Sequence, residues 1–537
     1  MREEQIASSF TEESPPEPQE TESLKVGVEK APPAATNFTK PEEMSDQRTF
    51  WKAQAKLLAI ATLAGLANNW PWSFPRNDNV NTYAFFGVVL VILVGSVATI
   101  TVVSGFDKPN KPGAAVKTPP FLGREQTEEW KGWMQILFIA YHYYRARFIY
   151  NEIRVFVSSY VWMTGFGNFL YFDRKKDFSL TRMVSMVIRI NWFPVILGMT
   201  VLSIEMFGFG RTVESPGTKS NPVSDENMNT FAYLLKTTFE LYYVVPLHTL
   251  GFFATWLCCW VACKAEEQCG LSYVKSRIFG MKVCLLLHVL FFETGMNDAV
   301  ILHGMNSYEI NFRFVCDKYS CWQGIVCGFL MEYCQSHLET ETRDDLYRQF
   351  HSKAPLMAFG GISTMVAWYV NFGSEPKKKI YNATHVYLIL LPIVGYLWLR
   401  NCTEFVRARY AKMLEFFGKI TLETYVMQFH LFMCRDVQHI LVLLPFSMIY
   451  PDKSLGQGED QPAMAQIVQG LNMVTVGFIY VMVARMARDA TVETQMSVTN
   501  IMSAYMNQAS GASPVKLKPV NDGPVLPTTR VGAAPAE

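Results

Sequence analysis

The sequence contains little charge and none of the short motifs that mark the common classes of soluble enzyme. Only 18% of its 537 residues are charged, and the formal net charge is +1. Gly-rich dinucleotide and P-loop motifs are absent, as are the GxSxG nucleophile elbow and the HExxH zinc motif. No basic tract is dense enough to suggest a nucleic-acid surface. These absences argue against soluble dehydrogenases, P-loop NTPases, serine hydrolases and zinc peptidases, and we expect no nucleic-acid partner.

Cysteine is present, but not in a pattern typical of a disulfide framework or a zinc site. The eleven Cys residues include no CxxC pair, and most lie in or beside apolar runs. A buried Cys behaves there as a small hydrophobic residue. Cys316 and Cys321 lie close enough in one predicted loop to form a disulfide. We expect no bound metal.

Long apolar runs, in contrast, are abundant. Hydrophobic residues make up 50% of the chain, with 38 Phe and 26 Met, a composition that indicates a polytopic membrane protein. We predict an all-α fold of about 10–12 transmembrane helices in one bundle. The clearest runs are residues 82–106, 153–172, 183–202, 241–263, 281–294, 322–334, 354–372, 386–399, 419–433 and 464–483.

The two ends of the chain differ from its apolar middle. Residues 1–48 are rich in Glu, Pro, Ser and Thr and lack the apolar core of a secretory signal. We therefore predict a disordered tail there. Two membrane segments and a linker are expected at 49–120, a multi-span domain at 121–487 and a flexible tail at 488–537.

The orientation in the membrane can be predicted from the basic linkers. Placing residues 108–131, 174–182 and 400–412 in the cytosol also places both termini there. The loop at 373–384 then lies in the lumen, where its sequon offers Asn382 for glycosylation. Three consecutive lysines at 377–379 argue mildly against this orientation.

Three ionisable residues near the C-terminal end of the membrane region form a candidate site. If residues 419–433 are one helix, Lys419, Glu423 and His430 lie within about 40° of one another on one face. Polar groups at membrane depth are costly unless they face protein, water or ligand. One interpretation is an interfacial ion pair and a structural His. The other is an acyl- or proton-transferring imidazole supported by a carboxylate and a cation.

His142 and the residues around Glu309 can likewise be interpreted as structural or as functional. His142 lies among three Tyr residues inside the predicted span at 134–144, so it is either a buried, hydrogen-bonded structural His or a second catalytic imidazole facing His430. Glu309, Arg313 and Asp317 recur every four residues, so a helix would place them on one side. They form either a solvated face or a buried network.

Basic residues on the expected cytosolic side are also ambiguous. The group is Arg124, Lys131, Arg407, Arg409 and Lys412. Cytosolic loops of membrane proteins are ordinarily rich in such residues. The same side chains could hold the phosphates of an acyl donor such as coenzyme A. A membrane region with His, Glu, Arg and Lys permits acyl transfer, and it equally permits a proton-coupled transporter.

Several runs make the chain similar to a known family. Residues 123–135 (GREQTEEWKGWMQ) and 418–430 (GKITLETYVMQFH) are the most specific, and residues 160–171 and 242–247 (YYVVPL) agree with them. They resemble a membrane O-acetyltransferase family that includes fungal capsule O-acetylation proteins, plant reduced-wall-acetylation proteins and the animal sialic acid O-acetyltransferase. The resemblance covers roughly residues 120–485.

The chain departs from the family pattern in two ways. Asn311 and Lys318 replace an aromatic or His and an Arg beside Glu309, Arg313 and Asp317. Some relatives also carry a lumenal hydrolase-like domain between the first two spans, whereas residues 66–81 alone separate them here. The plant type is similar in this respect. The resemblance therefore implies direct transfer within the membrane or delivery of acetyl groups to a separate lumenal transferase.

The resemblance implies an O-acetyltransferase of the Golgi or another endomembrane. Its donor would be acetyl-CoA, its acceptor a hydroxyl of a lumenal polysaccharide or glycan, and its surroundings membrane lipids. The alternative is a carrier of acetyl-CoA or acetyl groups that supplies a separate lumenal acetyltransferase. The expected catalytic residues are His430, His142 and Glu423. The expected substrate-binding residues are Glu309, Arg313, Asp317, Tyr319 and His385, and the expected donor-binding residues are Lys419, Arg124, Lys131 and Arg400.

Overall fold

The computed structural model describes residues 40–69, 73–75, 82–103, 121–206, 239–304, 307–338, 342, 345, 346, 349, 352–434, 439–443 and 463–510. The chain divides into two compact units, residues 1–44 and 45–537, and almost all the described residues belong to the second. Residues 104–120, within the predicted linker, and residues 207–238 lie outside the described residues.

Helices account for most of the described residues, as the apolar runs predict. The α-helices are α1 (Lys40–Asn68), α2 (Thr82–Ala98), α3 (Arg124–Tyr144), α4 (Tyr150–Lys175), α5 (Leu180–Ile204), α7 (Val244–Cys269), α8 (Tyr273–Glu293), α9 (Tyr308–Asp317), α10 (Ser320–Glu332), α12 (Ala354–Trp368), α13 (Lys378–Leu388), α14 (Leu390–Asn401), α15 (Glu404–Arg407), α16 (Lys412–Lys419), α17 (Thr421–Met427) and α19 (Ala463–Ser510). Short π-helical segments are η4 (Asp298–Gly304), η5 (Tyr333–His337), η6 (Tyr369–Gly373) and η7 (Gln428–Phe432), and η1 (Arg147–Ile149) is a 3₁₀ turn. Both α1 and α19 extend into the segments predicted to be tails.

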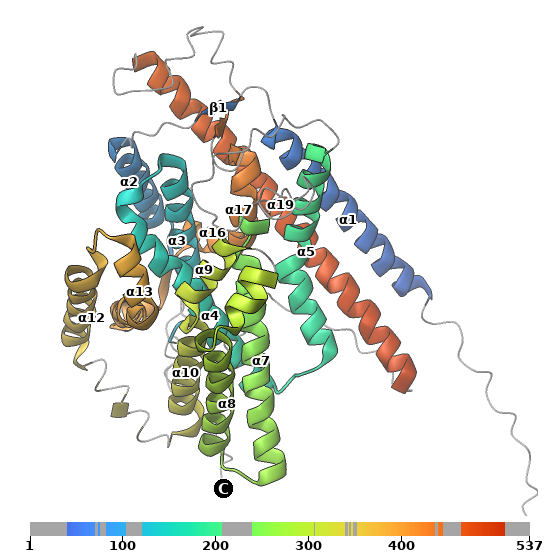
Figure 1. Ribbon diagram of the computed structural model, residues 1–537, viewed down its shortest axis with the longest axis vertical. Coiled ribbons are helices and arrows are strands. Elements are labelled where there is room, and N and C mark those ends of the chain that lie inside the picture. The colour runs from blue at the N-terminus through green and yellow to red at the C-terminus, as the bar shows by residue number, and fades with distance from the viewer. Residues whose placement is uncertain are drawn as a thin grey trace, which may run out of the picture. The chain divides into compact units, whose positions relative to one another are not determined.

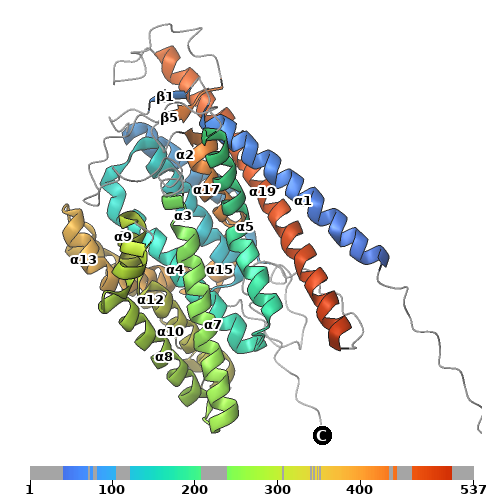
Figure 2. The ribbon, with the colours of Figure 1, turned by 45° about the vertical axis from the view of Figure 1, so that its right-hand side comes forward.

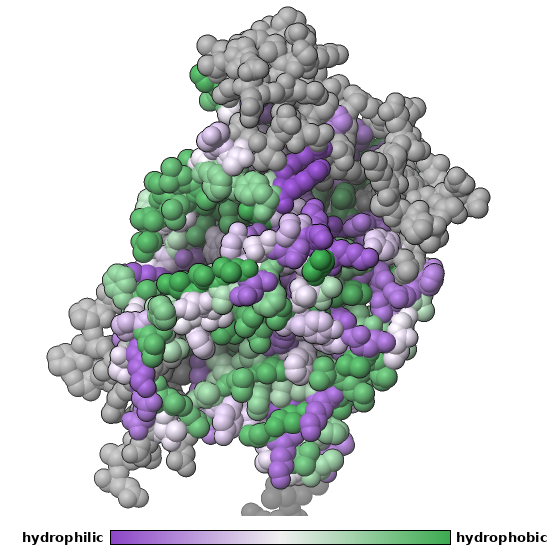
Figure 3. Space-filling view, turned by 60° about the vertical axis from the view of Figure 1, so that its left-hand side comes forward, coloured by the Kyte–Doolittle hydropathy of each residue, from purple (hydrophilic) through white to green (hydrophobic). Residues whose placement is uncertain are grey.

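Three of the described helices are long and apolar enough to cross a membrane: α5, α7 and residues 467–506 of α19. A fourth span is possible if α13 and α14 are taken together, although they are bent by 58° within the apolar run predicted at 386–399. Large apolar side chains such as Val91, Leu286, Phe359 and Phe478 are exposed. Apolar residues cover much of the face in Figure 3, which is the surface expected of a protein that contacts lipid.

The predicted continuous helix over residues 419–433 does not form. α16 ends at Lys419, the chain turns at Ile420 (φ −107°, ψ 18°), and α17 continues into η7. The stretch is therefore two short helices and a π segment. Helical periodicity cannot be carried across the turn, so Lys419 does not share one regular helical face with Glu423 and His430.

Close helix packing brings α3 against α16. A Cβ at Gly132 would overlap the carbonyl oxygen of Leu414, and a Cβ at Gly418 would overlap that of Glu128. Because Gly has no Cβ, the two backbones can approach at both positions. The pairs α4–α10, α7–α8 and α5–α19 are also in contact, and α19 lies beside α5 in Figure 1 and Figure 2.

Two small sheets were not predicted by the all-α interpretation. β1 (Ser73–Pro75), β5 (His439–Leu441) and β4 (Met433–Cys434) form one antiparallel sheet in that order. β2 (Ile100–Val102) pairs with β3 (Arg409–Ala411). Strands of two or three residues carry no readable alternation, so their pairing depends on distant segments that come together in the fold.

All eleven Cys residues are free, so the disulfide between Cys316 and Cys321 is not formed. Cys316 is near the end of α9 and Cys321 near the start of α10. The thiol of Cys321 donates to the carbonyl of Gly251 in α7 at 3.4 Å. Packing on another helix therefore determines where this thiol points.

Candidate functional site

A cavity of about 280 Å³ lies between α3, α4, α5, α7, α16, α17 and α19. Its wall is mostly apolar, and each of these seven helices contributes at least one polar side chain. The polar and charged residues that line it are Glu128, Lys131, Gln135, Tyr160, Thr164, Asn168, Tyr171, Arg182, Arg189, His248, Lys419, Thr421, Tyr425 and Arg488. Such a cavity, apolar with a few convergent polar groups, is the usual form of a small-molecule site.

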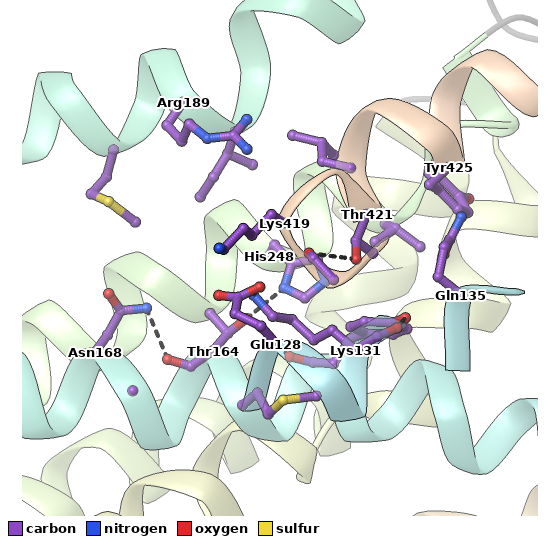
Figure 4. A pocket seen from close by; sticks show the side chains of 18 of the residues that line it. Glu128, Lys131, Gln135, Thr164, Asn168, Arg189, His248, Lys419, Thr421 and Tyr425 are labelled. Atoms are coloured by element: carbon purple, nitrogen blue, oxygen red, sulfur yellow. Dashed lines mark hydrogen bonds and ion pairs between the residues drawn. The ribbon is translucent and has the colours of Figure 1, made fainter. Parts of the chain in front are cut away.

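The cavity brings together two of the predicted donor-binding residues, Lys131 and Lys419. They come from α3 and α16, whose close approach at Gly132 and Gly418 puts them on the same wall. Lys131 pairs with Glu128 at 2.8 Å, and Lys419 pairs with Glu415. In Figure 4 the side chains of Glu128, Lys131 and Lys419 surround His248.

Arginine adds further positive charge to the same wall. Arg189 of α5 pairs with the buried Glu423 at 2.6 Å. The guanidinium of Arg182 lies over the ring of Tyr171, 3.9 Å from its centroid. Arg488 of α19 donates to the carbonyl of Lys419 at 3.0 Å. The lining thus contains five Lys and Arg residues and one acidic residue, so the cavity favours an anionic ligand.

His248 lies near the N-terminal end of α7 and lines the cavity. Its Nδ1 is 2.5 Å from the hydroxyl oxygen of Thr164 on α4. Thr164 also donates to the carbonyl of Tyr160 at 3.1 Å. Figure 4 shows the imidazole beside Thr164, between the helices that carry Lys419 and Lys131. The sequence places His248 in an apolar run after the similar residues 242–247, but we did not predict it as a site residue.

The three predicted residues of the 418–430 stretch lie in different surroundings. Lys419 and Glu423 do not pair with one another, because the turn at Ile420 separates them and each has another partner. His430 is 2% exposed, and its Nε2 is 2.5 Å from the Tyr242 hydroxyl. Neither Glu423 nor His430 lines the cavity.

His142 lies at the C-terminal end of α3 and packs among aromatic rings. Its ring centroid is 4.7 Å from that of Phe138 and 6.0 Å from that of Phe429, the neighbour of His430. His142 therefore lies on the same side of the fold as His430, and it does not line the cavity.

The predicted substrate-binding residues divide into two groups. Glu309 and Arg313 pair at 3.5 Å on α9, as their spacing predicts, and both are partly exposed. Arg313 also lies over the ring of Tyr243, 4.3 Å from its centroid. Tyr319 lies apart from these, donating to Glu293 at 2.8 Å.

Asp317 and His385 belong to a buried network, one of the two alternatives considered for Asp317, but the sequence did not predict its other members. Asp317 accepts from Arg154 at 3.0 Å and from the Ser158 hydroxyl. The Ser158 oxygen is in turn 2.8 Å from Nε2 of His385. The hydroxyl of Tyr381 is 2.9 Å from Nδ1 of the same ring. The network ties α4, α9 and α13 together.

The remaining predicted residues lie outside the cavity. Arg400 donates to Glu129 and to the carbonyls of Val406 and Arg409, each at 2.6 Å. It therefore connects residues 406–409 to α3. Arg124 starts α3 and does not line the cavity. Asn382 lies inside α13, where its amide donates to the Tyr150 hydroxyl at 3.1 Å.

Metal ligands do not cluster in the described part of the chain. No group of three or more His, Cys, Asp and Glu side chains there could hold a metal ion.

Comparisons with known proteins identify relatives. A family model described as a 10 TM acyl transferase domain found in Cas1p matches residues 79–204 and 228–509. Its ten spans agree with the multi-pass membrane protein predicted from the apolar runs. An N-acetylneuraminate (7)9-O-acetyltransferase of Danio rerio is 25% identical over 349 residues, which are 61% of this chain and 40% of that protein. The chain thus matches less than half of the length of that relative. No solved structure matches the chain.

Proposed function

Because the chain belongs to the family of ten-span acyl transferase domains found in Cas1p, we propose that it is a membrane O-acetyltransferase. The donor is acetyl-CoA, taken from the cytosolic side, and the acceptor is a hydroxyl of a lumenal polysaccharide or glycan. The relative from Danio rerio acetylates a sugar, by its name. Membership confirms the resemblance read from residues 123–135 and 418–430.

The observation that carries the proposal is the cationic cavity. Coenzyme A carries several negative charges, and the lining offers Lys131, Lys419, Arg182, Arg189 and Arg488. Charge-assisted hydrogen bonds from such groups to phosphate are the strong ones. A volume of about 280 Å³ is near the lower end of small-molecule sites. It therefore suits the acetyl group and the narrow pantetheine arm, with the nucleotide lying outside it.

The acceptor would bind at Glu309 and Arg313 of α9, which do not themselves line the cavity. Both side chains are partly exposed and form a weak i,i+4 pair at 3.5 Å. A sugar hydroxyl can replace such a contact at little cost, because an exposed ion pair contributes only about 0–1 kcal/mol. Asp317 and His385 are buried, and both are hydrogen-bonded to the Ser158 hydroxyl, so we assign them to holding α9 in position.

The test uses the purified chain in detergent with acetyl-labelled acetyl-CoA and de-O-acetylated glycan. Alkali-labile acetyl ester on the glycan is the expected product. Lys131→Ala and Lys419→Ala should raise KM for acetyl-CoA about tenfold each, since a charge-assisted hydrogen bond contributes about 1.5–3 kcal/mol. Lys264→Ala is the control, because the Lys264 side chain is exposed, pairs with Glu267 and does not line the cavity.

The second candidate is a carrier that supplies acetyl groups to a separate lumenal acetyltransferase. The chain matches less than half of the length of the Danio rerio relative, so the experiment also tests for this carrier activity. Uptake of label into sealed vesicles without any acetyl ester on the glycan would favour the carrier and contradict the transferase.

A further inference from the structure

We propose that His248 is the residue that accepts the acetyl group from the donor, forming an acetyl-imidazole on its Nε2 within the cavity. The inference rests on the proposed function and names a covalent step for it. It replaces His430 and His142 as the residues expected to meet the thioester.

The hydrogen bonds of Thr164 determine which nitrogen of His248 is available. A threonine hydroxyl has one proton to donate, and a carbonyl oxygen can only accept. The contact of Thr164 with the Tyr160 carbonyl at 3.1 Å uses that proton. Thr164 must then accept from Nδ1–H of His248 at 2.5 Å. This arrangement leaves the lone pair of the ring on Nε2, the nitrogen with nucleophilic capacity.

The surroundings of Nε2 suit acyl transfer. Among the residues that line the cavity, His248 is the one imidazole, and Nε2 has no hydrogen-bond partner within the described residues. The positively charged Lys131 and Lys419 line the same space. A tetrahedral oxyanion and a departing thiolate would therefore form beside ammonium groups, which stabilises both.

His430 is less suited to this step. Its Nε2 is already bonded to the Tyr242 hydroxyl at 2.5 Å, and the ring is 2% exposed. It does not line the cavity. A donor held by Lys131 and Lys419 would reach His248 without crossing the protein core.

The proposed step balances as follows in atoms and charge. The Nε2 lone pair attacks the thioester carbonyl carbon, the C–S bond breaks, and its electron pair leaves with the sulfur. The products are a cationic acetyl-imidazole that keeps Nδ1–H and the thiolate of CoA. An acceptor hydroxyl then attacks the acetyl carbon, the C–N bond breaks and its pair returns to the ring. The hydroxyl proton passes to Nε2 and finally to the thiolate, giving the ester and CoA thiol.

An acyl-enzyme predicts a reaction that needs no acceptor. Purified full-length chain is incubated with acetyl-CoA and radiolabelled CoA, and label in acetyl-CoA is measured. Reversible transfer of the acetyl group to His248 moves label from free CoA into acetyl-CoA, as expected of a ping-pong enzyme. His248→Ala should lower the exchange rate at least about 100-fold, as for loss of a nucleophile or base. His288→Ala in α8 is the control and should exchange at the wild-type rate.

A second pair of variants keeps the test independent of folding. Thr164→Val removes the hydroxyl that holds Nδ1–H and should slow exchange about tenfold, whereas Thr164→Ser should retain it, as one hydrogen bond contributes about 0.5–1.5 kcal/mol. Monodisperse elution in detergent identifies folded variants.

The outcomes separate the inference from the proposed function. Wild-type exchange in a folded His248→Ala protein, or ester formation by the wild type without exchange, overturns the acetyl-imidazole and leaves the transferase standing. Exchange without ester on any glycan supports the acetyl-imidazole and overturns the transferase. Exchange lost in His430→Ala but not in His248→Ala assigns the step to His430 and overturns the inference.

Discussion

The carboxylate of Asp317 is 1% exposed and depends on two neighbours, the guanidinium of Arg154 at 3.0 Å and the hydroxyl of Ser158. Arg154 is itself 3% exposed. A buried charge that loses its partner is strongly unfavourable, whereas an exposed pair contributes little. The ion pairs of this protein therefore differ widely in importance, and burial predicts which of them hold α9 in place.

Removing Arg154 tests this difference. Arg154→Ala leaves Asp317 buried without its cation and should destabilise the protein by about 3–5 kcal/mol. Glu309→Ala, which removes the partly exposed partner of Arg313, should change stability by about 0–1 kcal/mol. Melting temperatures in detergent measure both. Equal shifts in the two variants would contradict the structural role of the Arg154–Asp317 pair.

The shape of the cavity depends on how closely α3 and α16 approach. At Gly132 and Gly418 a side chain would collide with the backbone of the facing helix. A collision with backbone cannot be relieved by rotating a side chain, so the helices must separate. The cavity wall carrying Lys131 and Lys419 would then open.

Gly418→Ala is the corresponding experiment. We expect lower stability, by about 1–3 kcal/mol as for overpacking, and a higher KM for acetyl-CoA. Gly470→Ala is the matched control, because no atom lies within 4 Å of its added Cβ in α19. There the helix should gain about 0.5–1 kcal/mol, since Ala is the better helix former. A Gly418→Ala protein with wild-type stability and KM would show that the helix contact does not shape the donor site.

Different groups of hydrogen bonds hold the two ends of α4. At its C-terminal end Asp173 accepts from Arg277 of α8 at 2.5 Å. At its N-terminal end Asn151 donates to the carbonyls of Gly373 and Glu375, at 2.8 and 2.9 Å. A helix of 26 residues is about 39 Å long, so its two ends lie far apart. Residues 373–384, which contain the sequon at the start of α13, thus lie at the opposite end of α4 from the basic residues 174–182.

Labelling in sealed vesicles tests the predicted orientation. Cys269, exposed at the end of α7, should react with a membrane-impermeant maleimide from the cytosolic side. A Cys introduced by Ser374→Cys, at an exposed position of the other loop, should react only after the vesicles are opened. Labelling of both sites from the same side would contradict this topology and with it the lumenal position of Asn382.

Local patterns in the chain predicted the features that need only neighbouring residues. Abundant long apolar runs indicated membrane helices, and a four-residue spacing placed Glu309 and Arg313 together on α9. The runs at 123–135 and 418–430 sufficed to identify the family. Sequence periodicity failed at Ile420, because a single turn between α16 and α17 breaks the helical phase.

The sequence by itself determined that this chain is a helical membrane protein of an acyl transferase family, because apolar runs and family motifs consist of residues that are consecutive in the chain. Tertiary structure alone decided which polar residues of separate helices meet. Glu423 pairs with Arg189, 234 positions away, instead of with Lys419. His248 reaches Thr164 across 84 positions. Such contacts arise when separate helices pack, so spacing along the chain does not predict them, and the cavity they line exists only in the folded protein.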